Sequence, residues 1–310
     1  MITTVTLNAS IDKMYRLACS FETGTVMRVA EVSNSAGGKG LNALRAIAAC
    51  GEEVCATGFV GGNNGRMLCE LAEADGIPCD FVQVAGETRC CINAIDETRV
   101  STELLEPGQP VNADDLLEFE AKLAELAGRS EVVTISGSAP AGLPGDVYRQ
   151  LVDIVKRNGS RVILDTSGKL LVESLTAAPT MVKPNSDEIQ AILGHRPEGL
   201  AEVVSAAREV RGRYGIEQVV VSLGSKGAVM DCANGTFKVT PAKIEALNPV
   251  GSGDTMVGTF AVAMSRGMAP AEQLRFASAC ASANCLTQRT GRFEMADAER
   301  LMAQTVVEEL

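Results

Sequence analysis

One stretch in the second half of the chain combines a glycine-containing turn, a single carboxylate and a long apolar run. Gly251, Ser252 and Gly253 form the turn, and from Asp254 to Gly267 almost all residues are apolar or small. This pattern predicts a loop that leads into a buried helix. Backbone N–H groups at such a helix start favour a phosphate or a developing negative charge. Asp254 is therefore either a helix cap or a catalytic base beside an anion hole.

A second glycine-containing loop also precedes a helical pattern. Gly37, Gly38 and Gly40 surround Lys39, and Asn42 follows within the first helical turn. Glycines let a ligand approach the backbone closely, the lysine offers a positive charge, and the asparagine can both donate and accept hydrogen bonds. The alternative is a plain turn with an exposed lysine.

Four further polar side chains could contact a ligand. Asp12 follows the first predicted strand and could accept hydrogen bonds from sugar hydroxyls, or it could be an ordinary surface acid. Ser138 follows a later predicted strand. Arg28 and Arg89 lie in strand-like stretches, and a guanidinium fits the geometry of a phosphate, although isolated arginines on strands are usually solvated.

Two later stretches place polar residues where a strand ends. In Lys183-Pro-Asn185-Ser-Asp-Glu188, the asparagine and glutamate could form a capping arrangement, or they could hold a hard cation through water. Ser222–Gly227 is either a glycine hairpin turn or a phosphate cradle with Lys226 nearby.

The composition argues against several functional classes. The net charge of −11 does not fit nucleic acid as the main partner. No apolar run approaches the ~20 residues that cross a bilayer. Ten cysteines without a CxxC pair, together with His195 as the only histidine, argue against zinc and favour reduced thiols in the cytoplasm. Neither GxxxxGK(S/T) nor GxGxxG after the first strand is present, so a Walker-type NTPase and a dinucleotide dehydrogenase have little support.

The pattern of elements indicates a mostly parallel sheet covered by helices on both faces, because strands that alternate with helices form right-handed βαβ units. Strands are predicted at 2–7, 54–60, 131–135, 162–164, 181–183 and 218–222. Helices are predicted at 38–50, 65–75, 112–127, 145–158, 169–175, 186–193 and 199–213. Ligands bind at the carboxyl ends of such strands, and several polar motifs fall there: Asn8–Asp12, Ser136–Ser138, Asp165, Lys183–Asn185 and Ser222–Gly224.

Two stretches, at about 14–33 and 86–106, contain strand signals without this alternation. They predict a small antiparallel sheet that serves as a lid over the site. Ordinary edge strands are the alternative. With no repeat and no low-complexity linker, the chain is expected to form one domain over residues 1–310.

The order of these motifs resembles the PfkB (ribokinase-like) family of carbohydrate kinases over essentially the whole chain. Gly37–Asn42 is similar to the family's first signature, and Asn248–Asp254 is similar to its second. Other motifs, among them Gly86–Arg89, resemble the branch that contains tagatose-6-phosphate kinases and 1-phosphofructokinases. Two residues depart from that branch: Ala9 stands where proline is usual, and Ala139 where leucine is usual.

The resemblance implies a ribokinase-like three-layer α/β/α domain with a mainly parallel central sheet, a small antiparallel β-sheet lid, and a homodimer formed through that lid. It implies ATP and Mg²⁺, with Asp254 as the base, Gly251–Asp254 as the anion hole and Glu188 near the metal through water. The sugar side would consist of Asp12, Arg28, Gly37, Gly38, Lys39, Asn42, Arg89 and Ser138. The nucleotide side would consist of Lys183, Asn185, Ser222, Gly224, Lys226, Gly227 and Asn284.

The expected reaction is the phosphorylation of tagatose 6-phosphate to tagatose 1,6-bisphosphate by a cytoplasmic enzyme that needs neither nucleic acid nor a membrane. A 1-phosphofructokinase is the first alternative. A kinase of the same fold that acts on nucleosides or unphosphorylated sugars would not need the two lid arginines. A non-catalytic sugar-phosphate sensor is the alternative of another class.

Overall fold

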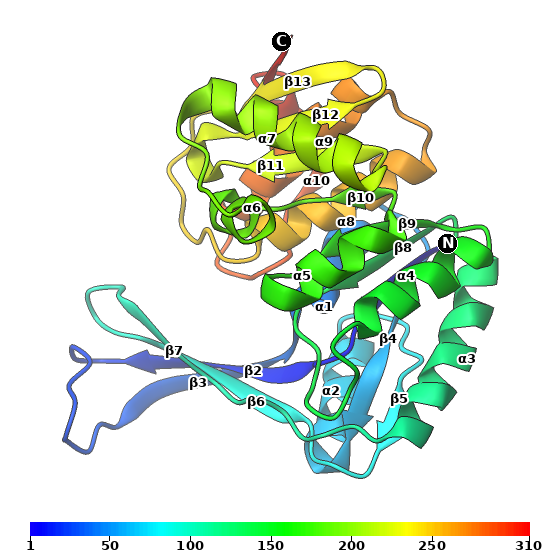
Figure 1. Ribbon diagram of the computed structural model, residues 1–310. Coiled ribbons are helices and arrows are strands. Elements are labelled where there is room, and N and C mark those ends of the chain that lie inside the picture. The colour runs from blue at the N-terminus through cyan, green and yellow to red at the C-terminus, as the bar shows by residue number, and fades with distance from the viewer.

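The computed structural model describes residues 1–310 and has three layers, with one sheet between two layers of helices (Figure 1). The sheet has ten strands in the order β14-β13-β12-β11-β10-β9-β8-β1-β4-β5. The parallel strands are β1 (Ile2–Thr6), β4 (Val54–Gly61), β5 (Val82–Val84), β8 (Val132–Ser136), β9 (Arg161–Asp165), β10 (Met181–Val182) and β11 (Gln218–Ser222). The antiparallel strands are β12 (Ala228–Cys232), β13 (Gly235–Thr240) and β14 (Val306–Glu309).

Each face of the sheet has its own helix layer and its own apolar core. One layer contains α1 (Lys39–Ala49), α2 (Gly62–Ala74), α8 (Ser252–Ser265), α9 (Pro270–Asn284) and α10 (Met295–Met302). The other contains α3 (Ala113–Arg129), α4 (Val147–Arg157), α5 (Gly168–Ser174), α6 (Ser186–Leu193) and α7 (Gly199–Tyr214). In β11, Val220 faces the first core, and Val219 and Val221 face the second. A strand buried on both faces needs a continuous apolar run, which is why this one was recognisable.

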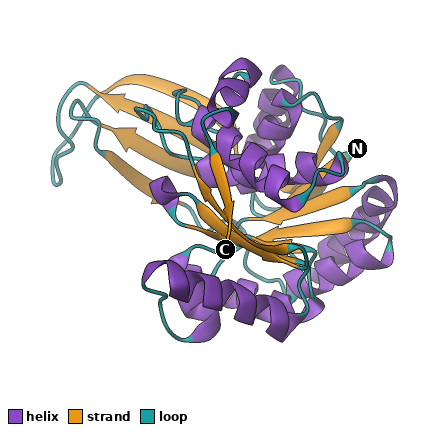
Figure 2. Cartoon of the chain, turned by 90° about the horizontal axis from the view of Figure 1, so that it is seen from above, coloured by secondary structure: helices purple, strands orange, loops and turns teal.

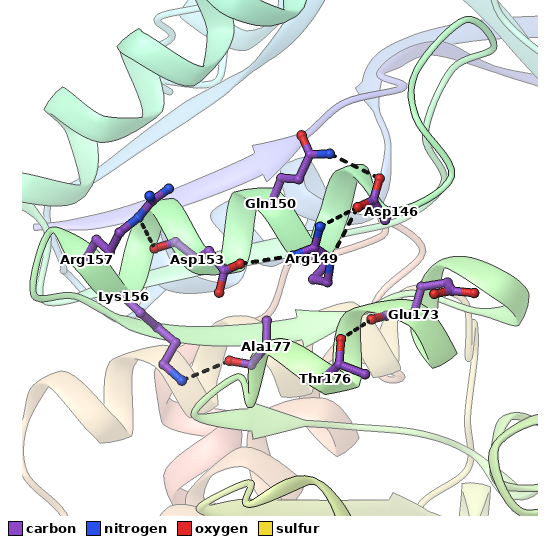
Figure 3. A network of polar contacts seen from close by, with 9 residues as sticks. All are labelled: Asp146, Arg149, Gln150, Asp153, Lys156, Arg157, Glu173, Thr176 and Ala177. Atoms are coloured by element: carbon purple, nitrogen blue, oxygen red, sulfur yellow. Dashed lines mark hydrogen bonds and ion pairs between the residues drawn. The ribbon is translucent and has the colours of Figure 1, made fainter.

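Polar contacts line the solvent side of the second helix layer (Figure 3). Arg149 in α4 lies between Asp146 and Asp153, and Lys156 Nζ donates to the Ala177 carbonyl at 2.9 Å. Exposed ion pairs contribute little to stability. The layer is therefore held mainly by the buried side of its helices.

The sequence prediction of a mainly parallel, ribokinase-like α/β sheet is confirmed, and it missed the antiparallel edge formed by β12, β13 and β14. These strands lie outside the βαβ alternation on which the prediction relied. No helix has both the length and the apolar character that crossing a membrane requires.

The predicted lid is a four-stranded sheet of β2 (Ser10–Leu17), β3 (Val29–Gly37), β6 (Arg89–Ile95) and β7 (Ser101–Leu105), in the order β3-β2-β6-β7. It projects from the body of the molecule as a long blade (Figures 1 and 2). The outer pairs are antiparallel, and the central pair β2–β6 is parallel. The strand signals predicted at about 14–33 stop short of the end of β3, which runs on to Gly37 because the polar stretch Ser33–Ser35 pairs with β2 although its residues are poor strand formers.

Candidate active site

Two helix starts meet at the carboxyl ends of the central parallel strands, and they bring Asn42 in α1 next to Asp254 in α8. Asn42 Nδ2 donates to Asp254 Oδ2 at 2.8 Å. The approach is possible because α1 and α8 pack backbone to backbone: a Cβ at Gly258 would lie 2.3 Å from the carbonyl oxygen of Ala43. A glycine in one apolar helix therefore sets the distance between the two polar residues.

The start of α8 presents free backbone donors. Gly251 has a φ of 77°, a left-handed conformation that favours glycine. The N–H groups of Gly251, Gly253 and Asp254 have no partner within the protein. Lys183 lies beside them, since its Nζ would be 3.6 Å from a Cβ on Gly253. The helix dipole, the free donors and the ammonium together form a site for a strongly negative group.

A buried carboxylate holds two lysines at this site. Asp165, at the end of β9, accepts from Lys39 at 3.3 Å and from Lys183 at 3.2 Å. Burial opposes ionisation of Asp165, but the ammonium groups of Lys183 and Lys39 lower its pKa. The Lys39 side chain keeps 43% of its surface exposed, whereas Lys183 keeps only 7%. Lys39 is thus the more accessible of the two charges.

Asp254 has the opposite shift. Loss of solvent and the negative charge of Asp165 raise the pKa of Asp254 to about 6, although Asn42, Lys39 and Lys183 act in the other direction. The residue remains partly exposed. A carboxylate with a pKa near 6, open to the site and beside an anion hole, is suited to accept a proton near neutral pH.

One face of the lid sheet reaches this site at its base. Ser10 pairs with Arg89, and Asp12 with Cys91, so the side chains of these alternate residues lie on the same face. Ser10 Oγ donates to Asp12 Oδ1 at 2.7 Å, and burial raises the pKa of Asp12. A Cβ at Gly37 would lie 2.1 Å from that carboxylate, so the glycine provides the space that Asp12 occupies.

Asn8 connects three loops beside the lid. Its Nδ2 donates to Ser138 Oγ and to the Pro107 carbonyl, both at 3.1 Å. Arg89 Nε donates to the Asn8 carbonyl at 3.0 Å, and its Nη1 donates to the Glu106 carbonyl at 2.9 Å. These contacts fix the guanidinium and leave its Nη2 without a protein partner.

On the opposite side of the anion hole, β10 and β11 end next to each other. Asn185 accepts from the N–H of Glu188 at 2.9 Å, and the Glu188 carboxylate accepts from the Asn185 N–H at 2.8 Å. This is the capping box that the sequence offered as the structural alternative. Ser222 forms a parallel bridge with Asn185, which places the two residues side by side.

The residues after Ser222 form the turn between β11 and β12. Gly224 begins a short 3₁₀ turn with a φ of 60°, and Lys226 ends it without an ion-pair partner. A Cβ at Gly227 would lie 1.9 Å from the Val239 carbonyl oxygen, so only glycine fits there. The stretch is a glycine-containing turn between two antiparallel strands with one unpaired lysine near its end, and its contact with a nucleotide phosphate stays a prediction.

A family model described as pfkB family carbohydrate kinase matches residues 5–296. The chain belongs to this family. It is a carbohydrate kinase with a ribokinase-like fold.

Similar proteins support this assignment over the full length of the kinase. It is 37% identical to a tagatose-6-phosphate kinase from Staphylococcus epidermidis, with 100% of each chain covered. The solved phosphofructokinase-2 from Escherichia coli, a complex with potassium, superposes with a TM-score of 0.93 at 28% identity, covering 98% of each chain. A possible 1-phosphofructokinase from Thermotoga maritima superposes with a TM-score of 0.90 at 26% identity, covering 100% of this chain and 99% of the other.

The kinase does not bring every predicted residue into its site. Arg28 is exposed and precedes β3 at the far end of the lid sheet, where Leu17 pairs with Val29. Arg89 lies at the opposite end of that sheet, paired with Ser10. Within one chain, the two arginines therefore cannot bind the same phosphate, contrary to the prediction.

Asn284 also has a different place from the one predicted. It is 1% exposed, its Nδ2 donates to the Val250 carbonyl at 3.1 Å, and its Oδ1 accepts from the Gly291 N–H at 2.8 Å. Both ends of the amide are thus used within the kinase. Asn284 holds the loop that precedes α8 instead of lining an open nucleotide surface.

Asp165 is the residue whose role the sequence did not reveal. It was recognisable only as one of several polar residues at a strand end. One partner, Lys39, lies 126 residues earlier in the sequence. The other, Lys183, directly follows the neighbouring strand β10. The available signal was an acid after the apolar run Val162–Leu164, which does not identify the two lysines as its partners.

Proposed function

We propose that the kinase transfers the γ-phosphoryl group of ATP to tagatose 6-phosphate and forms tagatose 1,6-bisphosphate. The observation that carries this proposal is the position of Asp254, partly exposed beside three free N–H groups and two lysines. The base of the lid, with Asp12 and Arg89 on one face, offers a second polar surface for the sugar.

In the proposed reaction, Asp254 accepts the proton of the attacking sugar hydroxyl while the oxygen bonds to the γ-phosphorus and the ADP oxygen leaves. The N–H groups of Gly251, Gly253 and Asp254 bind the phosphoryl oxygens as negative charge spreads over them. Lys183 neutralises part of that charge from beside Gly253, and Asp165 keeps the ammonium oriented. Positioning contributes at least as much as proton removal, since phosphoryl transfer is loose.

The residues on the nucleotide side fit a magnesium ion that is bound mainly through water and phosphate. No group of three His, Cys, Asp or Glu residues is placed to form a protein cage. Mg²⁺ in kinases commonly uses only one or two carboxylates and keeps several waters. Glu188 is partly exposed, and only one of its oxygens caps α6, so it would hold the ion through water. The ion would supply charge neutralisation between the transferred phosphates.

The sugar phosphate is proposed to bind along the lid base. Arg89 and Lys39 would bind the phosphate that the sugar already carries, while Asp12, Asn42 and Ser138 would contact its hydroxyls. Gly37 and Gly38 provide the space in which the Asp12 carboxylate and the Thr6 side chain lie beside this surface. The name of the relative from Staphylococcus epidermidis, a tagatose-6-phosphate kinase at 37% identity, favours a 6-phosphorylated ketohexose.

The second candidate substrate is fructose 1-phosphate, which the kinase would convert to fructose 1,6-bisphosphate. Its support is the similarity to the possible 1-phosphofructokinase from Thermotoga maritima. The two substrates carry their phosphate at opposite ends of the sugar. A site that binds this phosphate at Arg89 and presents the other end to Asp254 cannot serve both equally well.

A coupled assay that measures ADP release with a panel of sugars tests the proposal. We expect the highest kcat/KM with tagatose 6-phosphate, compared with fructose 6-phosphate, fructose 1-phosphate, unphosphorylated fructose and a nucleoside. A higher value with fructose 1-phosphate would establish the second candidate instead. A non-catalytic sensor would bind a sugar phosphate and release no ADP with any member of the panel.

The Asp254→Asn variant tests the base in the same assay. We expect kcat to fall by on the order of 10²–10⁴, the usual range for a general base. Binding of the sugar phosphate, measured by calorimetry, should change little because the amide keeps the size of the carboxylate. Near-normal turnover by this variant would remove Asp254 from the mechanism.

We also propose that the kinase forms a homodimer through its lid. The solved phosphofructokinase-2 from Escherichia coli has a form described as tetrameric and inhibited, so that protein assembles. In this chain the lid projects into solvent with large apolar side chains exposed, among them Val32 and Leu104.

A further inference from the structure

A cavity of about 600 Å³ lies outside the residues assigned to substrate or nucleotide. Its walls are α1, the turn after α2, and the segment that follows α9. Ala48, Ala49, Ile77 and Phe293 provide apolar parts of the wall. Cavities of ~300–1,000 Å³ are typical of small-molecule sites. The cavity is therefore large enough for a small metabolite.

The cavity is positively charged in a strongly acidic chain. Three guanidinium groups line it, from Arg45, Arg289 and Arg292, against two carboxylates, from Asp75 and Glu294. Arg45 is only 7% exposed and pairs with Asp75 at 3.2 Å, and Arg292 pairs with the same carboxylate. Arg289 forms no ion pair, and neither does Glu294. Three guanidinium groups against two carboxylates leave the lining with one net positive charge, and Arg289 is the guanidinium that no carboxylate pairs with.

A chain of hydrogen bonds connects this cavity to Asp254. Arg45 Nη1 donates to Asn42 Oδ1 at 3.1 Å, and Asn42 Nδ2 donates to Asp254 Oδ2 at 2.8 Å. The segment after α9 packs against the backbone of Asn42, because a Cβ at Gly291 would lie 2.5 Å from the Asn42 backbone carbonyl oxygen. The orientation of the Asn42 side-chain amide therefore depends on Arg45, which lines the cavity.

We propose that this cavity binds a small organic anion with a phosphate monoester, and that the bound anion regulates the kinase through Arg45 and Asn42. Arg289 and Arg292 would bind the phosphate, since guanidinium groups fit its oxygens in pairs. Arg292 would then leave Asp75. Arg45, now the only guanidinium paired with Asp75, would move closer to that carboxylate and away from Asn42. The binding site stands on the cavity alone, whereas the regulation rests on the proposed role of Asp254 as the base.

The direction of the effect follows from the Asn42 contact. Burial and the charge of Asp165 raise the pKa of Asp254 to about 6, while the hydrogen bond from Asn42 and the ammonium groups of Lys39 and Lys183 act to lower it. If Arg45 withdraws, the Asn42 amide loses one of its anchors and its bond to Asp254 weakens. The pKa of Asp254 then rises, so the bound anion should inhibit most strongly on the acid side of the activity profile.

Calorimetric titration with 3-phosphoglycerate as the probe tests the binding. Arg289→Glu should weaken binding by roughly tenfold or more, since it replaces a charge-assisted hydrogen bond with repulsion. Arg275→Glu is the matched control, because it makes the same charge change on an exposed position of α9 that does not line the cavity. Arg89→Ala should leave binding of the probe unchanged.

Weaker binding of 3-phosphoglycerate in Arg289→Glu alone supports the proposed site in the cavity. Binding lost in Arg89→Ala but kept in Arg289→Glu would place the probe in the substrate site and overturn the proposal. Equal weakening by Arg289→Glu and Arg275→Glu would show a nonspecific charge effect, and absence of binding to the wild-type protein would also overturn it.

The pH dependence of kcat/KM, measured with and without saturating 3-phosphoglycerate, tests the regulation. We expect the acid limb to move to higher pH with the probe, and this shift should be absent in Arg289→Glu. Binding without a shift would overturn the regulatory part. If Asp254 is not the base, the Asp254→Asn variant would keep full activity in the absence of 3-phosphoglycerate, which is a different result from the absence of a pH shift.

Discussion

Two carboxylates of the site, Asp254 and Asp165, have environments that move their pKa values apart. Asp165 is surrounded by two ammonium groups and stays ionised, whereas burial and the charge of Asp165 raise the pKa of Asp254 to about 6. Neighbouring acids with separated pKa values usually have separate roles. The arrangement suits Asp254 for proton transfer and Asp165 for holding Lys39 and Lys183 in place.

This difference predicts the pH dependence of the kinase. A base must be ionised to accept a proton, so kcat/KM should rise with pH through about 6 and level off above it. Asp165→Asn removes the charge that raises the pKa of Asp254 and leaves two lysines that lower it. The acid limb of kcat/KM should therefore move to lower pH, while the plateau falls because the lysines lose their partner.

The measurement is a kcat/KM profile for the wild-type protein and for Asp165→Asn. If the acid limb of the Asp165→Asn profile moved to higher pH, the proposed coupling between Asp165 and Asp254 would be contradicted. Asp153→Asn on α4, where the side chain is partly exposed, is a control that removes one charge outside the site, and its acid limb should match the wild type.

Arg89 has a testable role on the sugar side. Arg89→Ala should raise KM for the phosphorylated sugar by about 10–100-fold, the effect expected when charged hydrogen bonds are removed. Weak activity on unphosphorylated fructose should remain comparatively intact, because that sugar has no phosphate for Arg89 to bind. Steady-state kinetics with both sugars gives the answer. Equal losses on both would mean that Arg89 acts only through its bonds to the Asn8 and Glu106 carbonyls.

Individual site residues could be predicted where the local sequence carried the signal. The turn before Asp254 and the glycines around Lys39 were recognisable because their chemistry lies in consecutive residues. No role could be assigned to Asp165 from the sequence, because its partners Lys39 and Lys183 come close to it only in the folded protein. Arg28 was misplaced because the pairing register of a strand, which a local pattern does not specify, put it at the far end of the lid.

At the scale of elements, the contact between α1 and α8 positions the two polar residues at their N-terminal ends. Gly258 permits that contact, since any side chain there would meet the Ala43 carbonyl oxygen. We expect Gly258→Ala to lower the free energy of unfolding by about 1–3 kcal/mol, the usual cost of overpacking. It should also lower kcat, because separating the helices moves Asn42 away from Asp254.

Gly128→Ala is the matched control for that substitution. Gly128 also lies inside a helix, but a Cβ there would have no neighbour within 4 Å. Alanine should therefore raise the free energy of unfolding by about 0.5–1 kcal/mol, because it restricts the unfolded chain and favours the helix. Urea unfolding of both variants measures the contrast. Destabilisation by both substitutions to the same extent would contradict the role of the close helix contact.

Helices and strands could be predicted where their burial left a regular spacing of apolar residues in the sequence. The main parallel strands and most helices had continuous apolar runs or helical spacing and were recovered, whereas the helices α9 and α10 were not among the predicted elements. The edge strands β12, β13 and β14 were not, because an antiparallel extension breaks the alternation that identified the others. Strand β3 was recovered only in part, since Ser33–Ser35 gains its strand conformation from pairing with β2.

At the scale of the whole molecule, the lid sheet has two chemically different faces. Strand register places Asp12 and Arg89 on one face, next to the active site. The other face carries an apolar stripe, since Tyr15 pairs with Val32, and Ile92 pairs with Leu104. Val32 is 55% exposed and Leu104 is 57% exposed. Such a stripe on a sheet that projects from the molecule fits a contact with a second copy of the chain.

A double substitution, Val32→Lys with Leu104→Lys, should therefore convert the proposed homodimer into a monomer, because a contact between two copies would place four new ammonium groups on the apolar stripe. Sedimentation velocity at matched concentrations measures the change. Leu105→Lys is the control: this residue is 62% exposed but pairs with Cys91, which puts its side chain on the face of Asp12, so its variant should remain dimeric. A wild-type protein that sediments as a monomer would refute assembly through the lid, and a double variant that remains dimeric would place the contact elsewhere.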